Sequence, residues 1–202
     1  MGSMGATLRV ATIGDAAAIA AIYAPYVTDT VISFEERPPT AEEMAQRLAK
    51  TLPQYPWLVA EADGKVVGYA YGGRFAERAA YRWSVETTVY VRQDSHRAGI
   101  GRSLYELLIV ILIFQGYHSA FGGITLPNAA SIGLHEAMGF EPVGIYKEVG
   151  FKFGRWLDVG WWRFGLLESR RVPHDILPPF RAPHSPMPFE LFQQEYDILN
   201  PR

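Results

Sequence analysis

The segment SHRAGIGRSLY, residues 95–105, constrains the fold of this chain more than any other stretch. It follows SVETTVYV, residues 84–91, whose alternating pattern predicts a β-strand. It leads into an apolar run that ends at Gly116, a residue type that closes helices. Because Gly99 and Gly101 stand between these two patterns, the sequence predicts a strand, a glycine turn and a helix in direct succession.

The glycine turn is suited to binding an anion through its backbone. The small residues Ala98, Gly99 and Gly101 let successive N–H groups face one point, and the N-terminus of the following helix adds its own N–H groups and dipole. Arg97 and Arg102 add local positive charge, which favours a pyrophosphate. Two glycines serve a turn for steric reasons as often, so that alternative stays open.

Two common nucleotide sites do not fit this turn. No Gly-Lys-Ser/Thr follows it, as a Walker loop requires, and GIGRSL has two glycines where a dinucleotide fingerprint needs three. The pattern therefore argues against a nucleotide hydrolase and a dehydrogenase.

The remaining local signals predict a mixed α/β (α+β) domain. We expect a helix capped by Asp15, a helix opened by the capping box of Thr40 and Glu43, a hairpin at Asp63-Gly64, a strand over 120–126, a helix over 128–140 and two strands over 142–166. We expect residues 1–5 to be a cloning remnant or disordered, 6–168 to form the domain, and 169–202 to form a proline-rich tail.

Composition limits the classes of partner. The 202 residues are 49% hydrophobic and 20% charged, which suits one soluble globular domain. The net charge of -2 argues against nucleic acid and an acidic membrane surface as partners. The absence of cysteine excludes disulfides and thiolate chemistry, and it suits the reducing cytoplasm. The five histidines show no helix-spaced pair with a carboxylate, so we expect no metal.

The apolar run LLIVILIF, residues 107–114, belongs to a core or an interface. Its eight residues fall well short of the roughly 20 that a membrane-spanning helix needs. Because a helix that is apolar on every side must be buried all round, the run predicts a homodimer.

Four segments together resemble a known family: YRWSVETTVYV, HRAGIGRSLY, LPNAASIGLHEAMGF and GFKFGRWLDVGWW. They resemble the successive signatures of the phosphinothricin N-acetyltransferase group within the GNAT superfamily, over about Leu8 to Leu167. The resemblance implies a GNAT fold, with a mixed, mostly antiparallel sheet flanked by helices, and acetyl-CoA as cosubstrate. It implies transfer of acetyl to the amine of an amino-acid-like substrate such as phosphinothricin, methionine sulfoximine or methionine sulfone.

The same resemblance assigns residues to the coenzyme. For the pantetheine arm it implies Val89, Tyr90, Val91 and Asn128, and for the pyrophosphate Arg97, Ala98, Gly99, Ile100, Gly101 and Arg102. Judged by periodicity alone, Val89 and Val91 are core strand residues. The family usually has Gln or Arg at the position of His96, so the charge at this point either depends on pH or falls to Arg97.

Acetyl transfer to an amine needs a base for the ammonium proton and a proton for the leaving thiolate. Glu86 is a carboxylate within an otherwise uncharged strand, and it matches the general base proposed for the family. His135 matches a histidine that the family places in catalysis, with a core histidine as the equal alternative. A third candidate, Tyr105, lies in the first helical turn after the glycines, where an aromatic residue is more often core.

The resemblance also implies an acceptor site. Arg78 aligns with an arginine that binds substrate anions, and Phe34 aligns with an aromatic residue that packs on the substrate. Ala76 stands where the herbicide-resistance enzymes have a lysine, which favours methionine sulfone or sulfoximine over the doubly anionic phosphinothricin. Two alternatives stay open: an acetyltransferase for another amine, such as a protein N-terminus, and a CoA-binding sensor without turnover.

Overall fold

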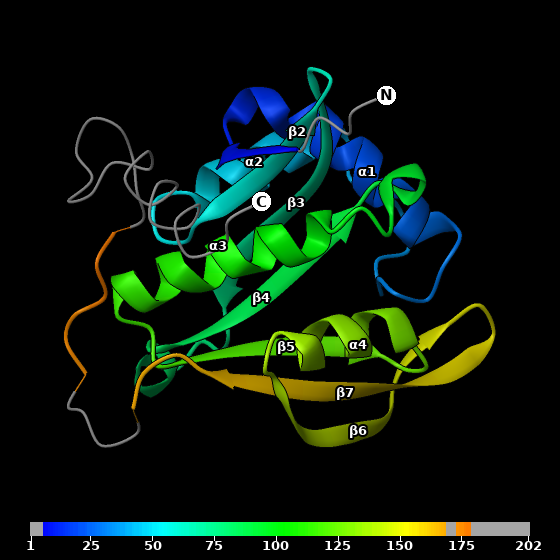
Figure 1. The fold of residues 1–202 in the computed structure, drawn as a ribbon. Coiled ribbons are helices and arrows are strands. Elements are labelled where there is room, and N and C mark those ends of the chain that lie inside the picture. The colour runs from blue at the N-terminus through cyan, green and yellow to red at the C-terminus, as the bar shows by residue number, and fades with distance from the viewer. Residues whose placement is uncertain (1–5, 169–172, 179–202) are drawn as a thin grey trace.

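The computed structural model describes residues 6–168 and 173–178. It contains a seven-stranded sheet of order β1-β2-β3-β4-β5-β7-β6, in which the β4/β5 pair is parallel and the other pairs are antiparallel (Figure 1). The strands are β1 (Thr7–Val10), β2 (Trp57–Ala62), β3 (Lys65–Arg74), β4 (Ser84–Val91), β5 (Ser119–Thr125), β6 (Glu141–Lys152) and β7 (Arg155–Gly165). The predicted mixed α/β class with a mostly antiparallel sheet is confirmed.

Four α-helices cover the two faces of this sheet. They are α1 (Ala16–Thr28), α2 (Ala41–Thr51), α3 (Ile100–Gln115) and α4 (Ala129–Ala137), and Figure 1 shows α3 and α4 together in front of the strands. Side chains of a strand alternate between faces, so Leu58 packs in the cluster that contains α3 and the adjacent Val59 packs in the cluster of α1 and α2. Both faces of the central sheet are therefore buried.

Most local signals have the predicted effect. The capping box closes in both directions, with the Glu43 N–H 3.2 Å from Thr40 Oγ1 and the Thr40 N–H 2.9 Å from Glu43 Oε2. Asp63 and Gly64 turn the β2–β3 hairpin with positive φ angles of 51° and 70°. The prediction that the Asp15 side chain caps α1 is wrong, because its carboxylate accepts two hydrogen bonds from the Arg9 guanidinium instead, at 2.8 and 2.7 Å.

The strands β4 and β5 separate, and this separation positions the site. β4 pairs with β3 from Val85 to Val91, but it pairs with β5 only from Ser84 to Glu86. Beyond Glu86, one backbone edge of β4 has no neighbouring strand in the described sheet. Figure 1 shows the two strands running apart from this point.

The apolar run in α3 is buried by its own chain. Leu107, Leu108, Ile111 and Leu112 are at most 1% exposed, Val110 and Phe114 are half-buried against the same core, and Ile113 is 39% exposed. The argument from this run to a homodimer is therefore wrong, because the core of one subunit already covers it.

The described residues include the predicted domain, 6–168, and only residues 173–178 of the predicted tail. Residues 1–5, 169–172 and 179–202 lie outside the described residues, and so does most of the proposed tail. The described segment 173–178 lies against the end of α3, where Leu177 and Gln115 exchange two hydrogen bonds of 2.9 Å.

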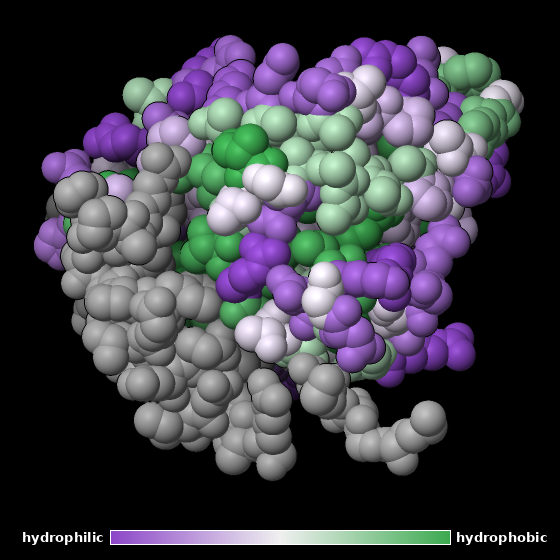
Figure 2. All heavy atoms as spheres, turned by 90° about the horizontal axis from the view of Figure 1, so that it is seen from above, coloured by the Kyte–Doolittle hydropathy of each residue, from purple (hydrophilic) through white to green (hydrophobic). Residues whose placement is uncertain are grey.

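Within the described ranges, every helix falls short of the length and apolar character needed to cross a membrane. On the face drawn in Figure 2, hydrophobic side chains lie around the centre with a hydrophilic group among them, and further hydrophilic side chains line the upper border.

Candidate functional site

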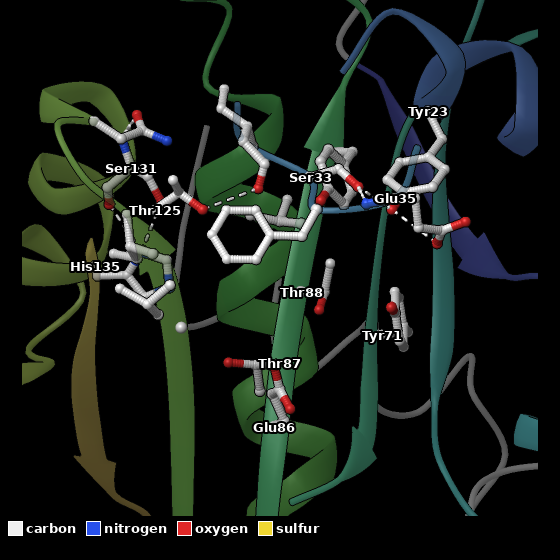
Figure 3. Close-up of a pocket in the computed structure, with 18 of the residues that line it drawn as sticks. Tyr23, Ser33, Glu35, Tyr71, Glu86, Thr87, Thr88, Thr125, Ser131 and His135 are labelled. Carbon is white, nitrogen blue, oxygen red and sulfur yellow. Dashed lines mark hydrogen bonds between the residues drawn. The ribbon is translucent and has the colours of Figure 1, made fainter. Parts of the chain in front are cut away.

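A cavity of about 700 Å³, here called the main pocket, opens beside the free edge of β4. Its walls come from β3 and β4, from β5 and α4, from the loop between α1 and α2, and from β6 and β7. Figure 3 shows Glu86 and Thr88 on β4, with Ser131 and His135 to one side and Tyr23, Ser33 and Glu35 to the other. The fold thus brings the two predicted catalytic residues, Glu86 and His135, into one cavity.

Glu86 lines the main pocket from the point where β4 leaves β5. Its neighbours along the strand, Val85 and Thr87, are both buried, as the alternation predicts. Burial raises the pKa of the Glu86 carboxyl group above its usual value, because desolvation disfavours the charged form. A carboxylate with a raised pKa is a better proton acceptor than an exposed one.

His135 is held in one orientation by both ring nitrogens. Nδ1 lies 2.8 Å from the carbonyl oxygen of Ser131 and therefore donates to it, which leaves Nε2 to accept from the Tyr105 hydroxyl at 3.0 Å. The ring is 3% exposed, and burial lowers the pKa of His135, so the neutral form is favoured. Tyr105 is 1% exposed in the hydrophobic core, as expected of an aromatic residue at this position, and it also lines the main pocket.

A glycine on β5 makes room for this imidazole. A Cβ atom at Gly122 would lie 2.4 Å from His135 Nε2, which is closer than carbon and nitrogen atoms can approach. The FGG sequence in β5 carries no local signal of this role, because the histidine that requires it lies on α4.

The predicted coenzyme residues surround the N-terminus of α3 and the free edge of β4. The first hydrogen bond of α3 runs from the Ser103 N–H to the Gly99 carbonyl at 3.0 Å, so the N–H groups of Ile100 and Gly101 precede it at the open end of the helix. Gly99 has a φ of 78° and Arg97 a φ of 63°, both in the left-handed region. Ala98 lies between them, and this end of α3 adjoins the strand that carries Val89, Tyr90 and Val91.

Three polar side chains near this helix end have other partners. Arg102 Nε binds Glu106 Oε1 at 2.7 Å, and His96 Nε2 lies 2.8 Å from the Tyr26 hydroxyl and 3.0 Å from the Val91 carbonyl. Asn128 caps α4 by accepting from the Ser131 N–H at 3.1 Å, and it lines the main pocket. The His96 ring is thus turned toward Tyr26 of α1 and the end of β4.

The sequence analysis missed a polar group at the far end of the main pocket. Arg47 of α2 binds both oxygens of Glu35, at 2.6 and 2.8 Å, and the Tyr23 hydroxyl donates to Glu35 Oε1 at 3.0 Å. The guanidinium holds the pKa of Glu35 below its usual value. No local pattern could reveal this group, because it joins α1, α2 and the loop between them.

The two predicted acceptor residues lie apart. Phe34 lines the main pocket, whereas Arg78 and Ala76 line a second cavity of about 490 Å³ together with Arg74 and Arg82. Arg82 lies over the ring of Trp83 at 3.6 Å. In the described part of the chain, no cluster of three or more histidine, aspartate or glutamate side chains has the arrangement of a metal site.

Comparison with known proteins agrees with this geometry. A family model described as an acetyltransferase (GNAT) domain matches residues 8–161. The chain is 41% identical to the phosphinothricin N-acetyltransferase of Streptomyces viridochromogenes over 77% of its own length and 85% of the relative. It is 40% identical to an L-methionine sulfoximine/L-methionine sulfone acetyltransferase of Pseudomonas aeruginosa, over 84% of its length and the whole relative.

A solved structure has the same fold. The phosphinothricin acetyltransferase of Sinorhizobium meliloti, in complex with acetyl-CoA, superposes with a TM-score of 0.81 at 38% identity. The match covers 85% of this chain and 94% of that one.

Proposed function

Because the chain belongs to the GNAT acetyltransferase family and is an acetyl-CoA-dependent N-acetyltransferase, we propose that the main pocket binds the amine of a small amino-acid-like acceptor. The observation that carries this proposal is the position of Glu86, a half-buried carboxyl group in a pocket that also has a polar far end. The relatives named above act on phosphinothricin and on methionine sulfoximine and sulfone, and we propose the same class of acceptor here.

Glu86 acts in this proposal as the general base. It takes the proton from the acceptor amine, directly or through water, so that the nitrogen lone pair can form the new bond to the acetyl carbon while the carbon–sulfur bond breaks. The leaving thiolate needs a proton in turn. We assign the Tyr105 hydroxyl, which lines the same pocket and is hydrogen-bonded to His135, as the group that gives this proton to the thiolate and regains one from the nitrogen as the amide forms.

The chain's own backbone holds the cosubstrate in this proposal. The N–H groups at the start of α3 bind the pyrophosphate, with Arg97, Ala98, Gly99, Ile100, Gly101 and Arg102 around it. Val89, Tyr90 and Val91 offer the free edge of β4 to the pantetheine arm, and Asn128 contacts the same arm from the start of α4.

The charge of the main pocket supports a preference among acceptors. Apart from tyrosines, the ionisable residues among its described lining are Glu35, Arg47, Glu86 and His135, and the one cation of this set, Arg47, is already paired with Glu35. An acceptor with a second anionic group has no further cation to bind among the described residues of the main pocket. Methionine sulfone and sulfoximine are therefore favoured over phosphinothricin. Ala76→Lys tests whether the second cavity contributes, because a gain for phosphinothricin would mean that the loop with Arg78 reaches the acceptor.

We also propose that the chain is a homodimer in the cytoplasm. The β6–β7 hairpin supports a dimer, because it exposes many large apolar side chains: Val143, Ile145, Tyr146, Val149, Phe151, Phe153 and Trp156. Sedimentation that gives only a 22.6 kDa species at micromolar concentration would contradict the dimer. The lack of cysteine supports a reducing compartment.

Thiol release from acetyl-CoA with a panel of amines tests the function. We expect turnover with the α-amine of methionine sulfone, methionine sulfoximine and phosphinothricin. Turnover only with a peptide N-terminus would favour the alternative acceptor class. Binding of acetyl-CoA without turnover of any amine would favour a sensor.

A further inference from the structure

Two segments far apart in the sequence close the main pocket from opposite sides. The loop between α1 and α2 contributes Ile32, Ser33, Phe34 and Glu35, and strand β6 contributes Tyr146 and Val149. The next residues of β6 belong to the GFKFG segment, residues 150–154. Coenzyme binding and the chemical step, as proposed above, give this segment no role.

Lys152 attaches the end of β6 to this loop. Its ammonium donates to the carbonyl oxygens of Val27 and Ser33, both at 2.7 Å, and the residue is only 8% exposed. The ion pairs found within the described ranges do not include Lys152. Because burying an ammonium group is costly unless its protons are bonded, these two bonds tie the end of β6 to the last turn of α1 through Val27 and to the loop through Ser33. A weaker bond of 3.4 Å joins Thr125 Oγ1 to the carbonyl of Ile32 in the same loop.

The Phe34 ring packs directly against the backbone of Gly150. A Cβ atom at Gly150 would lie 2.1 Å from Cε2 and 2.5 Å from Cζ of Phe34. The aromatic ring therefore occupies the space that any side chain at position 150 would need. Lys152 and Gly150 thus hold the backbone and the ring of the same loop, two residues apart on one strand.

We propose that Lys152 and Gly150 are positioning residues for the acceptor: together they latch the loop that carries Phe34 over the main pocket. Neither residue lines the pocket, so both act through Phe34 and its neighbours. The identity of the acceptor in this inference rests on the proposed function. The latch itself is a property of the chain alone.

Two variants test the latch by turnover. Lys152→Met removes both donors while keeping most of the apolar stem, and Gly150→Ala puts a methyl group in the space of the ring. For each we expect the KM for the acceptor to rise about ten- to hundred-fold, because a displaced positioning group has an effect of this order. The KM for acetyl-CoA should stay within about two-fold, since the coenzyme residues lie on β4, α3 and α4.

Matched controls come from the same strand. Lys147→Met removes an exposed ammonium that binds Asp158, and Gly144→Ala adds a methyl group with no atom within 4 Å of its position. Both should leave the KM for the acceptor unchanged. Equal effects of the control and test variants would overturn the inference, because they would reflect general damage to β6.

Two further measurements separate a latch from a merely structural role. If Gly150 serves to seat the Phe34 ring, Gly150→Ala should have no added effect in a Phe34→Ala background, whereas multiplying effects would overturn the inference. Amide hydrogen exchange should become faster at residues 29–36 in Lys152→Met, and unchanged exchange would also overturn it. Because exchange needs no acceptor, a wild-type protein that turns over no amine would refute the proposed function and still leave the latch testable.

Discussion

At the level of single residues, Glu86 carries a half-buried carboxyl group in the main pocket, and desolvation raises its pKa. We expect Glu86→Gln to lower turnover by about 100-fold or more, the scale for loss of a positioned base, with little change in acetyl-CoA binding. Thiol release and calorimetry measure the two effects. An unaltered rate at neutral pH would exclude Glu86 as the base.

The same substitution should stabilise the fold. A carboxyl group whose pKa is raised in the folded state contributes stability below its unfolded pKa, and that contribution is lost as the pH rises through the folded pKa. The wild type therefore carries a penalty above this range that Glu86→Gln lacks. Thermal unfolding of both proteins at several pH values should show a difference in Tm that grows as the pH rises, and a constant difference would contradict the sign.

Gly122 is the second residue where one small change bears on the site. Gly122→Ala places a methyl group 2.4 Å from the present position of His135 Nε2, so the imidazole must move and its bond to Tyr105 must break. We expect kcat to fall at least about ten-fold, as in His135→Ala, and no further fall when both substitutions are combined. Gly73→Ala is a matched control, because its Cβ atom would meet only contacts of 3.8 and 4.0 Å. A Gly122→Ala enzyme with wild-type kcat would show that His135 is a core residue without a part in catalysis.

At the level of elements, the start of α3 should decide the affinity for acetyl-CoA. A Cβ atom at Gly101 would have ordinary contacts with Val91 and Leu134, at 3.5 and 3.6 Å, so Gly101→Ala should fold. The branched side chain of Gly101→Val extends further into the space between β4 and α4, and we expect its Kd for acetyl-CoA to rise at least about ten-fold. Calorimetry measures this constant, with Gly133→Ala in α4 as a control that has open space. Equal affinity would mean that the glycine serves only the turn.

The elements themselves were predictable because their signals are local. The alternation in 84–91, the capping box at Thr40 and the Asp63-Gly64 turn each depend on residues within a few positions of one another. The separation of β4 from β5 was not predictable from these patterns, since it depends on where two strands with a whole helix between them stop pairing. The coenzyme residues could be named only through the family resemblance.

At the level of the whole molecule, the unpredicted parts of the site are contacts across long sequence distances. Lys152 reaches carbonyls that lie 125 and 119 residues earlier in the chain, and Glu35 meets Arg47 across the turn into α2. The apolar run at residues 107–114 did not indicate a dimer for a similar reason. A helix that is apolar on every side can be buried in the core of one subunit or in an interface, and the sequence does not distinguish the two. Local patterns identify such residues as charged or apolar, and only the assembled fold gives them partners.

The assembled pocket also sets the balance of charge that selects an acceptor. Among the described residues that line the main pocket, Arg47 is the one cation, and Glu35 engages both terminal nitrogens of its guanidinium at 2.6 and 2.8 Å. Phosphinothricin carries one more negative charge than methionine sulfone, so we expect the wild type to acetylate the sulfone at least as well. Glu35→Gln removes the competing carboxylate and leaves Arg47 available to an anionic acceptor. One charge-assisted hydrogen bond contributes about 1.5 to 3 kcal/mol, which corresponds to roughly 10- to 100-fold in preference.

The measurement is kcat/KM for both amines in the wild type, in Glu35→Gln and in Glu43→Gln. Glu43 is the control, because it binds Arg37 at 2.6 Å and neither residue lines the main pocket. The ratio should shift toward phosphinothricin in Glu35→Gln alone. A much higher kcat/KM for phosphinothricin than for the sulfone in the wild type would refute the argument from pocket charge. An unchanged ratio in Glu35→Gln would show that the anionic group of the acceptor binds elsewhere. The second cavity, around Arg78, would then be the next site to test.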